Sequence, residues 1–363
     1  MLFPLKIGLN IYYNSLDYSA KMKRFILMVT VSLLLVASVC CKVLSQGFKL
    51  NYRSVHSQSY VQDKSFYLLT LFEKLPGIDK ALAQSTIING ILKKKIGELN
   101  QVSNCKENVQ CTATAFLWSA SDIIIVGEEF KILGNSNKVF KDLVINYLRP
   151  SGRCIIYSSA DDGTLLQNAW IDAANGINSI ISTYALGVKA TYPDIDSVSY
   201  DVHSKTYARL IDIVSLQTLE HLDSEAFYKP SLDFGLNLLE VNNRNEAARF
   251  EPLKDTENHA VINYIKKINW NKYPYTFLVV PGAGNDLPNE SLAAWGKIRV
   301  KIAVERYNKG LAPIIAVSGG YVHPFQTPYC EALEMKKYLM SFYHIPGKAI
   351  LIDPYARHTT TNI

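Results

Sequence analysis

Residues 277–286, FLVVPGAGND, decide the fold of the C-terminal part of this chain. The four apolar residues 277–280 are typical of a short strand buried in a parallel sheet. The glycine-rich residues 281–285 predict a turn, and a helix is expected over 291–308. The stretch therefore predicts a strand, a tight turn and a helix, which is the first half of a β-α-β unit.

The same order of elements repeats towards the C-terminus. A second strand is expected over 314–317 and a third over 349–352. Thr327 and Pro328 predict the start of the helix between them, with threonine as the N-cap and proline at the first helical position. The pattern predicts a parallel sheet with right-handed connections, and such sheets bind ligands beyond the carboxyl ends of their strands.

Each of these two helices carries apolar residues at helical spacing. On the first helix we expect one side to hold Trp295, Ile298 and Ile302. On the second helix the expected buried stripe is Ala332, Met335, Leu339 and Phe342.

The chain before this unit has a different texture. Residues from about 64 to 270 favour helices, which we expect at 66–75, 78–99, 165–185, 205–222 and 231–248. The apolar runs 122–126 and 154–157 are too short to classify by their period. We expect two domains after the leader, a helical one over 46–270 and an α/β one over 271–363.

The N-terminus indicates export. Lys23 and Arg24 precede the apolar run 25–41, and small or β-branched residues follow, which is the order of a secretory signal. We expect a cleaved leader over 1–45, with Met22 as the true initiator, and a location in the periplasm or cell envelope. An uncleaved membrane anchor stays open as an alternative.

The charge of the chain argues against nucleic acid as a partner. The net charge is +6, but residues 1–45 contribute +4 of it, and no basic stripe with interleaved aromatic residues is present. Four of the six cysteines lie beyond the leader. Cys105 and Cys111 are close enough to close a small disulfide loop, although unpaired thiols are an equal alternative.

Three loops follow the three strands at one edge of the sheet. In the first, Gly282 and Gly284 let backbone N–H groups approach an anion. The loop lacks the third glycine of a dinucleotide fingerprint and the lysine of a P-loop, so neither NAD nor ATP is predicted. A tight strand-to-helix turn explains these glycines equally well.

The second loop contains Ser318, Gly319, Gly320 and His323, and Glu331 follows in the first turn of the next helix. Ser318 is a candidate nucleophile or phosphate ligand, but the surrounding residues do not form a GxSxG elbow. A carboxylate at the position of Glu331 is also favoured by the helix dipole alone.

The third loop brings Arg357, His358, Thr360 and Asn362 together, a dense set of donors that suits phosphate. Arg299, on the first helix, is expected to reach the same edge. No Cys/His spacing supports a metal site, and the sequence leaves the cofactor unknown.

Together these residues resemble the SanA/ElyC/YdcF-like family, whose shared domain is also called domain of unknown function 218. The matching elements are Val280-Pro281-Gly282-Ala283-Gly284, Arg299, Ser318-Gly319-Gly320, Glu331-Ala332 and Thr360-Thr361-Asn362. Residues 244–253, RNEAARFEPL, are similar to the segment before this domain in a long subgroup with a helical N-terminal region. The clear match covers about the last quarter of the chain.

The resemblance implies a Rossmann-like α/β/α domain and a tie to the bacterial envelope, without a settled reaction. Family members continue beyond the asparagine with a further helix and strands, so we expect this chain to be truncated, with the last strand left uncovered at its edge and face.

The leading hypothesis is an exported envelope protein that binds a phosphorylated or otherwise anionic small molecule of cell-wall or lipid-carrier metabolism. In it the loop glycines and Ser318 contact the ligand, Glu331 is the general base, and His358 is the second catalytic candidate. Arg299 and Arg357 balance charge, and the reaction class is phosphoryl or pyrophosphoryl hydrolysis. The alternative is a non-enzymatic ligand sensor or partner-binding protein. A Ser318–His358 acyl hydrolase and a metal bridged by Glu331, His323 or His358 are weaker alternatives.

Overall fold

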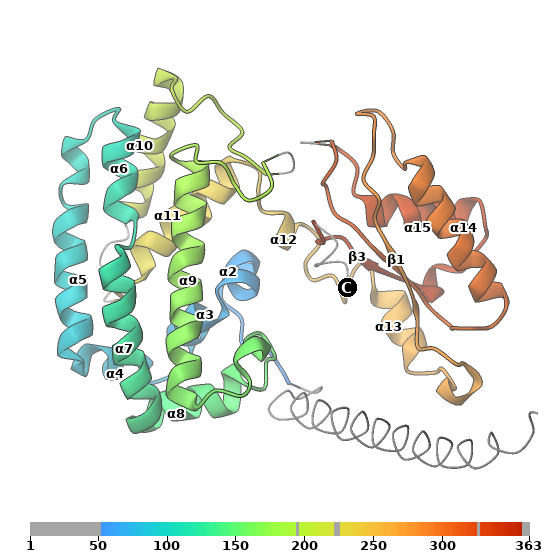
Figure 1. Ribbon diagram of the computed structural model, residues 1–363, viewed down its shortest axis with the longest axis horizontal. Coiled ribbons are helices and arrows are strands. Elements are labelled where there is room, and N and C mark those ends of the chain that lie inside the picture. The colour runs from blue at the N-terminus through green and yellow to red at the C-terminus, as the bar shows by residue number, and fades with distance from the viewer. Residues whose placement is uncertain (1–51, 194–195, 221–225, 325–326, 358–363) are drawn as a thin grey trace, which may run out of the picture.

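The computed structural model describes residues 52–193, 196–220, 226–324 and 327–357. It shows a helical region followed by a small α/β region, which lie side by side (Figure 1). The expected leader, over 1–45, and the site candidates His358, Thr360 and Asn362 lie outside the described residues.

The helical region extends from Tyr60 to Val241. Its α-helices are α2 (Tyr60–Ser65), α3 (Tyr67–Lys74), α4 (Ile78–Gln84), α5 (Thr86–Leu99), α6 (Val109–Phe116), α7 (Ala120–Ser136), α8 (Lys138–Leu143), α9 (Asp162–Tyr184), α10 (Lys205–Leu219) and α11 (Lys229–Val241). Two short helices follow, α12 (Glu246–Arg249) and α13 (His259–Ile265), and α13 packs against the α/β region (Figure 1). The long helix α9 packs along α7 and α11 and forms the centre of the bundle. Aromatic side chains fill that centre, where Trp170 is fully buried and lies edge-on to Trp118 and Phe130.

Several expected helices are present with different boundaries. The stretch expected as one helix over 78–99 is two helices, because the Ser85 hydroxyl accepts the Ile88 N–H and starts α5 anew. The unclassified run 122–126 lies within α7, and the run 154–157 contains a 3₁₀ turn, Ile155–Tyr157. Cys105 and Cys111 form a disulfide, whereas Cys154 and Cys330 are free thiols.

Within the described residues, one stretch, Val109–Ser136, is long and apolar enough by composition to cross a membrane. It comprises two helices, α6 and α7, separated by non-helical backbone at 117–119. Phe116 and Phe130 of this stretch are fully buried in the helical core. The stretch is thus only partly buried in the helical core, because 39% of its apolar window is buried and Ile124 and Ile132 are 59% and 60% exposed.

The α/β region contains strands β1 (Leu278–Pro281), β2 (Ile315–Ser318) and β3 (Ile350–Asp353) in the order β1-β2-β3, all parallel. Helix α14 (Ala294–Asn308) connects β1 to β2, and α15 (Glu331–Ser341) connects β2 to the 3₁₀ turn η5 (Gly347–Ala349) before β3. The coarse prediction of an α/β fold with a parallel sheet is therefore confirmed.

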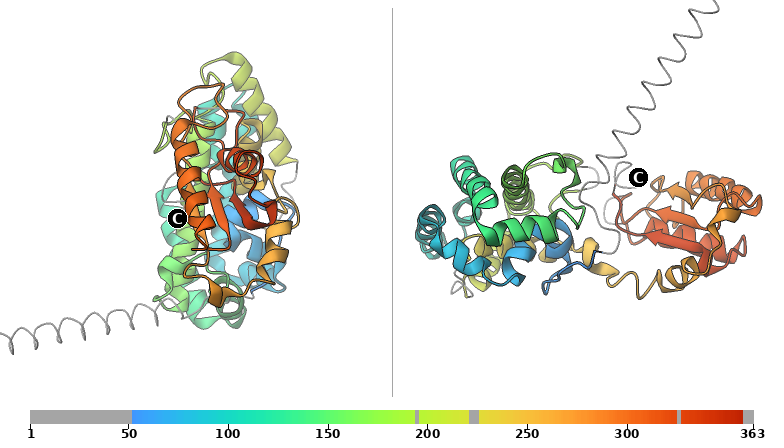
Figure 2. Two further views of the ribbon diagram at one scale, coloured as in Figure 1. Left: turned by 90° about the vertical axis from the view of Figure 1, so that its right-hand side faces the viewer. Right: turned by 90° about the horizontal axis from the view of Figure 1, so that it is seen from below.

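One face of the sheet packs against α14 and α15 and forms a second hydrophobic core. Val280, Val317 and Ile352 are buried there at one level of the sheet. On the opposite face Val279 is 45% exposed. Figure 2 shows the sheet edge-on beside the helical bundle.

The outer edge of β3 is partly covered, whereas the sequence predicted an uncovered edge. The Asn258 side chain accepts the Ile352 N–H and donates to the Ile352 carbonyl, both at 2.9 Å, in place of a neighbouring strand. Phe250 and Leu253 also pack against this second core, N-terminal to the boundary expected near 270. The more open strand is β1.

Two details of the α/β helices differ from prediction. On α14 the buried side holds Gly296, Val300, Ala303 and Val304, whereas Trp295, Ile298 and Ile302 are exposed. On α15 three of the four expected stripe residues are buried, and Phe342 is 63% exposed.

Helix α15 begins at Glu331, not at Thr327 and Pro328 as predicted. The Thr327 hydroxyl accepts the Tyr329 N–H and forms a local turn instead. The first N–H groups of the helix, those of Glu331 and Ala332, donate to the carbonyls of Gly320 and Gly319. Because the second loop satisfies these donors, the helix needs no side-chain cap.

Candidate functional site

The first loop, residues 281–285, is held by Glu331 from α15. The Glu331 carboxylate is 6% exposed, and its Oε1 accepts the Ala283 N–H at 2.5 Å and the Gly284 N–H at 3.2 Å. An internal carboxylate thus fills the concave set of backbone donors that the sequence suggested for a ligand anion. Glu331, predicted as the general base, is a buried acceptor for this loop.

The glycines of the loops explain how this carboxylate fits. A Cβ at Gly282 would clash with Glu331 Oε2, and one at Gly319 would approach the same oxygen to 3.1 Å. Gly284 adopts φ +76°, a left-handed conformation that strains other residues. The glycine spacing is therefore required by the approach of Glu331 and by the turn itself.

The remaining glycine N–H groups at this edge also have internal partners. Gly282 donates to the Ser318 carbonyl, Gly319 to that of Asp353 and Gly320 to that of Ala356. These bonds extend the parallel ladder beyond the strand ends. The structure brings the first and second loops together, as predicted. However, their glycine N–H groups form hydrogen bonds with neighbouring strand ends and loops, whereas the sequence suggested a bound anion as their partner.

Ser318 lies at the end of β2 and is 5% exposed. Its hydroxyl donates to the Asp353 Oδ2 at 2.7 Å, across to the end of β3. Asp353 in turn accepts the Tyr355 N–H through Oδ1. The Ser318 hydroxyl is therefore oriented by its neighbouring strand.

Arg299 reaches this edge from α14, as the sequence predicted. Its Nη1 donates to the carbonyls of Pro281 and Gly282, at 3.0 and 2.5 Å. His323 is exposed and lies over Gly284, where a Cβ would come within 3.1 Å of the imidazole. Arg299 and Glu331 thus bind the carbonyls and the N–H groups of the same loop.

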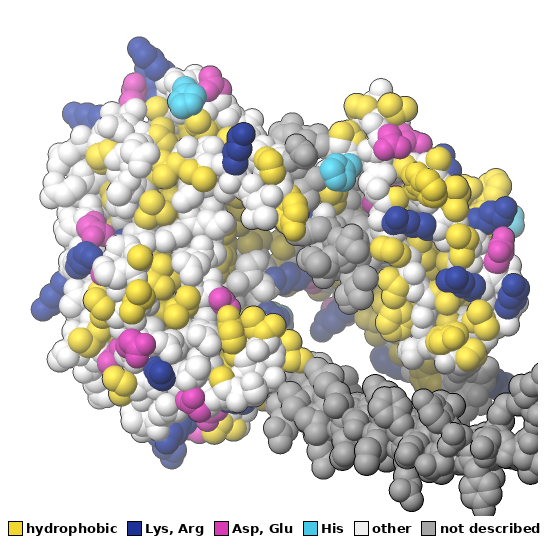
Figure 3. All heavy atoms as spheres, viewed as in Figure 1, with side chains coloured by type: hydrophobic (Ala, Val, Ile, Leu, Met, Phe, Trp, Pro, Cys, Tyr) yellow, Lys and Arg dark blue, Asp and Glu magenta, His cyan; other side chains and the backbone are white. Residues whose placement is uncertain are grey.

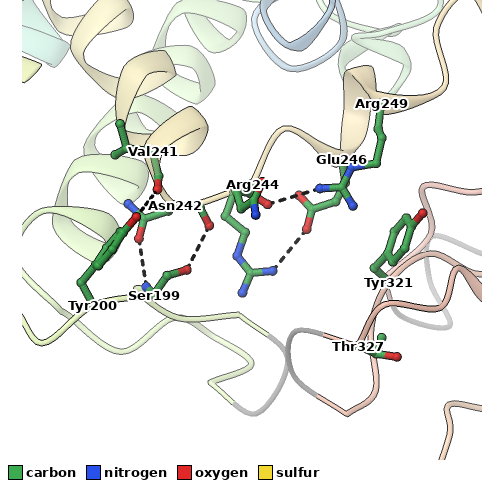
Figure 4. A pocket seen from close by; sticks show the side chains of 10 residues that line it. Ser199, Tyr200, Val241, Asn242, Arg244, Glu246, Arg249, Tyr321 and Thr327 are labelled. Atoms are coloured by element: carbon green, nitrogen blue, oxygen red, sulfur yellow. Dashed lines mark hydrogen bonds and ion pairs between the residues drawn. The ribbon is translucent and has the colours of Figure 1, made fainter. Parts of the chain in front are cut away.

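A cavity of about 450 Å³ lies beside the second loop, between the helical and α/β regions. Figure 4 shows its lining: Ser199, Tyr200, Val241, Asn242, Arg244, Glu246, Arg249, Tyr321 and Thr327, with Asn243. Tyr321 and Thr327 come from the loop after β2, so the cavity opens at the carboxyl ends of the strands. Parallel sheets bind their ligands at this edge.

Two arginines, Arg244 and Arg249, line the cavity, and Arg357 pairs with its lining residue Glu246. Glu246 Oε1 accepts from Arg244 and from Arg357, each at 3.2 Å. Arg249 is exposed, and its guanidinium carbon lies 4.7 Å from the centre of the Tyr321 ring. Two carboxylates lie near these three arginines. They are Glu246, at the cavity, and Asp196, whose Oδ1 is 3.6 Å from Arg244 Nε.

The same region joins the two parts of the chain. Tyr184, on α9, donates its hydroxyl to Asp196, and burial together with this carboxylate raises the pKa of the phenol. Nearby positive charge from Arg244 and Arg357 acts in the opposite direction. Residues of the helical core, the connecting segment and the third loop therefore share one electrostatic environment.

A second ion pair fastens the third loop to the N-terminal helices. Lys64 of α2 pairs with Glu251, and its Nζ lies 3.5 Å from the centre of the Tyr355 ring. Burial acts to raise the pKa of Glu251, but hydrogen bonds from Lys64, the Leu253 N–H and Tyr355 outweigh it and lower the pKa. Glu251 is therefore held as a carboxylate between the two regions.

The sequence did not identify as site residues several residues that the structure places at this edge: Arg244, Glu246, Arg249, Tyr321, Thr327 and Asp353. Three of them lie in the string RNEAARFEPL, which the family resemblance had already marked. Asp353 was recognisable as the first polar residue after an apolar strand. No group of three or more His, Cys, Asp and Glu side chains suited to a metal occurs within the described part of the chain.

Comparison with family models, curated proteins and solved structures finds no match to this chain.

Proposed function

We propose that this chain is an exported envelope protein that binds a phosphorylated or otherwise anionic small molecule in the cavity between its helical region and its Rossmann-like α/β region. The observation that carries the proposal is the position of Arg244 and Arg249 in a cavity at the carboxyl ends of the strands. Guanidinium groups bind phosphate oxygens in bidentate geometry. The resemblance to YdcF-like proteins supports the link to cell-wall or lipid-carrier metabolism.

The internal hydrogen bonds of the loops refine this proposal. Because Glu331 already accepts the Ala283 and Gly284 N–H groups, the ligand charge is balanced by side-chain guanidinium groups. Tyr321 offers an aromatic ring, and Thr327 lines the cavity from the same loop. The ligand class is therefore a compact anion with an attached ring or chain.

The test is calorimetric titration of the full chain with inorganic phosphate, inorganic pyrophosphate and farnesyl pyrophosphate. We expect Arg249→Ala to weaken binding by about 10- to 150-fold, since a charged hydrogen bond contributes about 1.5–3 kcal/mol. Arg209→Ala is the matched control, because Arg209 is an exposed arginine on α10 that pairs with Glu107. Equal binding by wild type and Arg249→Ala would remove the cavity from consideration.

The non-enzymatic alternative, a ligand sensor, is separated from a hydrolase by turnover. Release of phosphate from either pyrophosphate, followed over hours with the same protein, favours hydrolysis. Binding without any release of phosphate favours the sensor. Two internal hydrogen bonds agree with that alternative, because the Ser318 hydroxyl is bound to Asp353 and the Glu331 carboxylate is bound to the first loop.

A further inference from the structure

Helix α14 has apolar residues on two opposite sides. One side packs on the sheet through Val300, Ala303 and Val304. The other faces solvent: Trp295 is 64% exposed, Ile298 47% and Ile302 42%. These three residues are spaced i, i+3 and i+7, so they form one continuous stripe along the outer side of the helix.

Basic residues border this outer stripe. At 100° per residue, Arg299 and Arg306 fall on one flank of the stripe. On the other flank Glu305, the one acidic residue within the helix, lies next to the stripe, followed by Lys301 and then by Lys297 beside the buried side. No ion pair joins Lys297, Lys301 or Arg306 to any residue that the structure describes, so their charges remain available to a partner.

A groove at the open edge of β1 adjoins this stripe. Tyr275, Phe277 and Val279 are 61%, 47% and 45% exposed, and with Ile302 they line a groove of about 840 Å³. Arg299 and Arg306 line the same groove. In Figure 3 hydrophobic and basic side chains alternate over the part of the molecule that carries α14, with few acidic ones. We call this surface, 275–279 with 295–306, the α14 face.

We propose that the α14 face binds the surface of an anionic lipid bilayer. Helices that lie in a membrane interface place apolar side chains in the acyl boundary and cations at the headgroups, and Trp295, Ile298 and Ile302 with the basic residues beside them fit this arrangement. Anionic headgroups supply the opposite charge for Lys297, Lys301 and Arg306, which form no ion pair with the described residues.

The charges disfavour other partners. A second copy of the chain would bring the same arginines and lysines against each other. Nucleic acid would leave the central apolar stripe without a partner. The proposal does not rest on the anion-binding cavity, because none of the residues of the α14 face lines it.

The experiment is co-sedimentation of the full chain with vesicles of phosphatidylcholine alone or with a third of phosphatidylglycerol. We expect binding to the anionic vesicles, weakened by 0.5 M salt, because surface electrostatics are screened. Trp295→Ser with Ile302→Ser should lower the partition coefficient at least ~tenfold.

The matched control is Ile124→Ser with Ile132→Ser on α7, two isoleucines that are 59% and 60% exposed. This control should bind within about twofold of wild type. All of these proteins carry the same N-terminal segment, so a loss confined to the α14 variants is a loss of binding by the α14 face. Lys297→Gln with Lys301→Gln tests the charges without touching an apolar residue and should cost about tenfold. Undiminished binding of both α14 variants, or equal binding to neutral vesicles, would overturn the proposal.

Discussion

Replacement of Glu331 tests whether its carboxylate holds the first loop. Oε1 accepts N–H groups from Ala283 and Gly284, and the side chain is 6% exposed. Hydrogen bonds to a charged group contribute about 1.5–3 kcal/mol each, and buried donors without partners are costly. Glu331→Ala should therefore destabilise the α/β region by about 3–5 kcal/mol, a large part of the stability of an ordinary domain.

Glu331→Gln separates shape from charge. A glutamine with its amide oxygen at the position of Oε1 keeps the two hydrogen bonds to that atom, but it replaces Oε2, which also accepts the Gly284 N–H at 3.2 Å, by a donor. Loss of this contact and of the charge assistance should cost at least about 1–2 kcal/mol. The assay is hydrogen–deuterium exchange of the peptide over 278–287, with urea unfolding in parallel. A loss of 3 kcal/mol corresponds to an amide exchange rate raised by about 100-fold.

The control for this prediction is Glu334→Ala. Glu334 lies one turn further along α15 and pairs with exposed Lys337 at the surface, where an ion pair contributes about 1 kcal/mol or less. If Glu331→Ala leaves the amide exchange rates at 283 and 284 within twofold of wild type, Glu331 does not hold the loop. The role of general base would then be the better assignment for Glu331.

Three further predictions concern other contacts. Asn258→Ala removes both hydrogen bonds to Ile352 and should lower the free energy of unfolding by about 2 kcal/mol in urea titrations, whereas an unchanged midpoint would show that the edge of β3 does not need them. Burial raises the pKa of the Cys330 thiol to about 11, so the neutral thiol is retained below that pH and the folded state loses stability as the pH rises from about 9 towards 11. Alkylation by iodoacetamide, followed by mass spectrometry, should accordingly be slow at pH 8, and fast labelling of native protein would contradict this. Replacing Cys105 and Cys111 by serine opens a short loop and should cost about 2 kcal/mol by the chain-entropy model, measured as a lower melting temperature; equal melting of both proteins would count against it.

The α/β elements could be predicted because each is encoded locally. A four-residue apolar run, a glycine turn and a helix-forming stretch repeat at short range, and parallel strands fix their order by the handedness of the connections. The position of Arg299 at the strand edge followed from the same reasoning, because helical periodicity places it. Helix α14 ends at Asn308, as expected, and Gly310 follows in a left-handed conformation with φ +72°.

The contacts of Glu331 could not be predicted from the sequence. Its partners lie 47 and 48 residues away, and the glycines that admit its carboxylate resemble those of a ligand-binding turn. The outer stripe of α14 was ambiguous for a related reason. Periodicity groups Trp295, Ile298 and Ile302 on one side, but two apolar sides compete, and only the packed structure decides which one meets the sheet.

The pairing of Asn258 with β3 also determines how the sheet meets other chains. An unpaired strand edge is a template for aggregation, and a single amide side chain occupies the donor and the acceptor of Ile352 that an intruding strand would need. At β1, Pro281 has no N–H to offer, and Arg299 occupies its carbonyl. Groups at both edges of this small sheet thus hinder the addition of a further strand, although one face of the sheet is partly exposed.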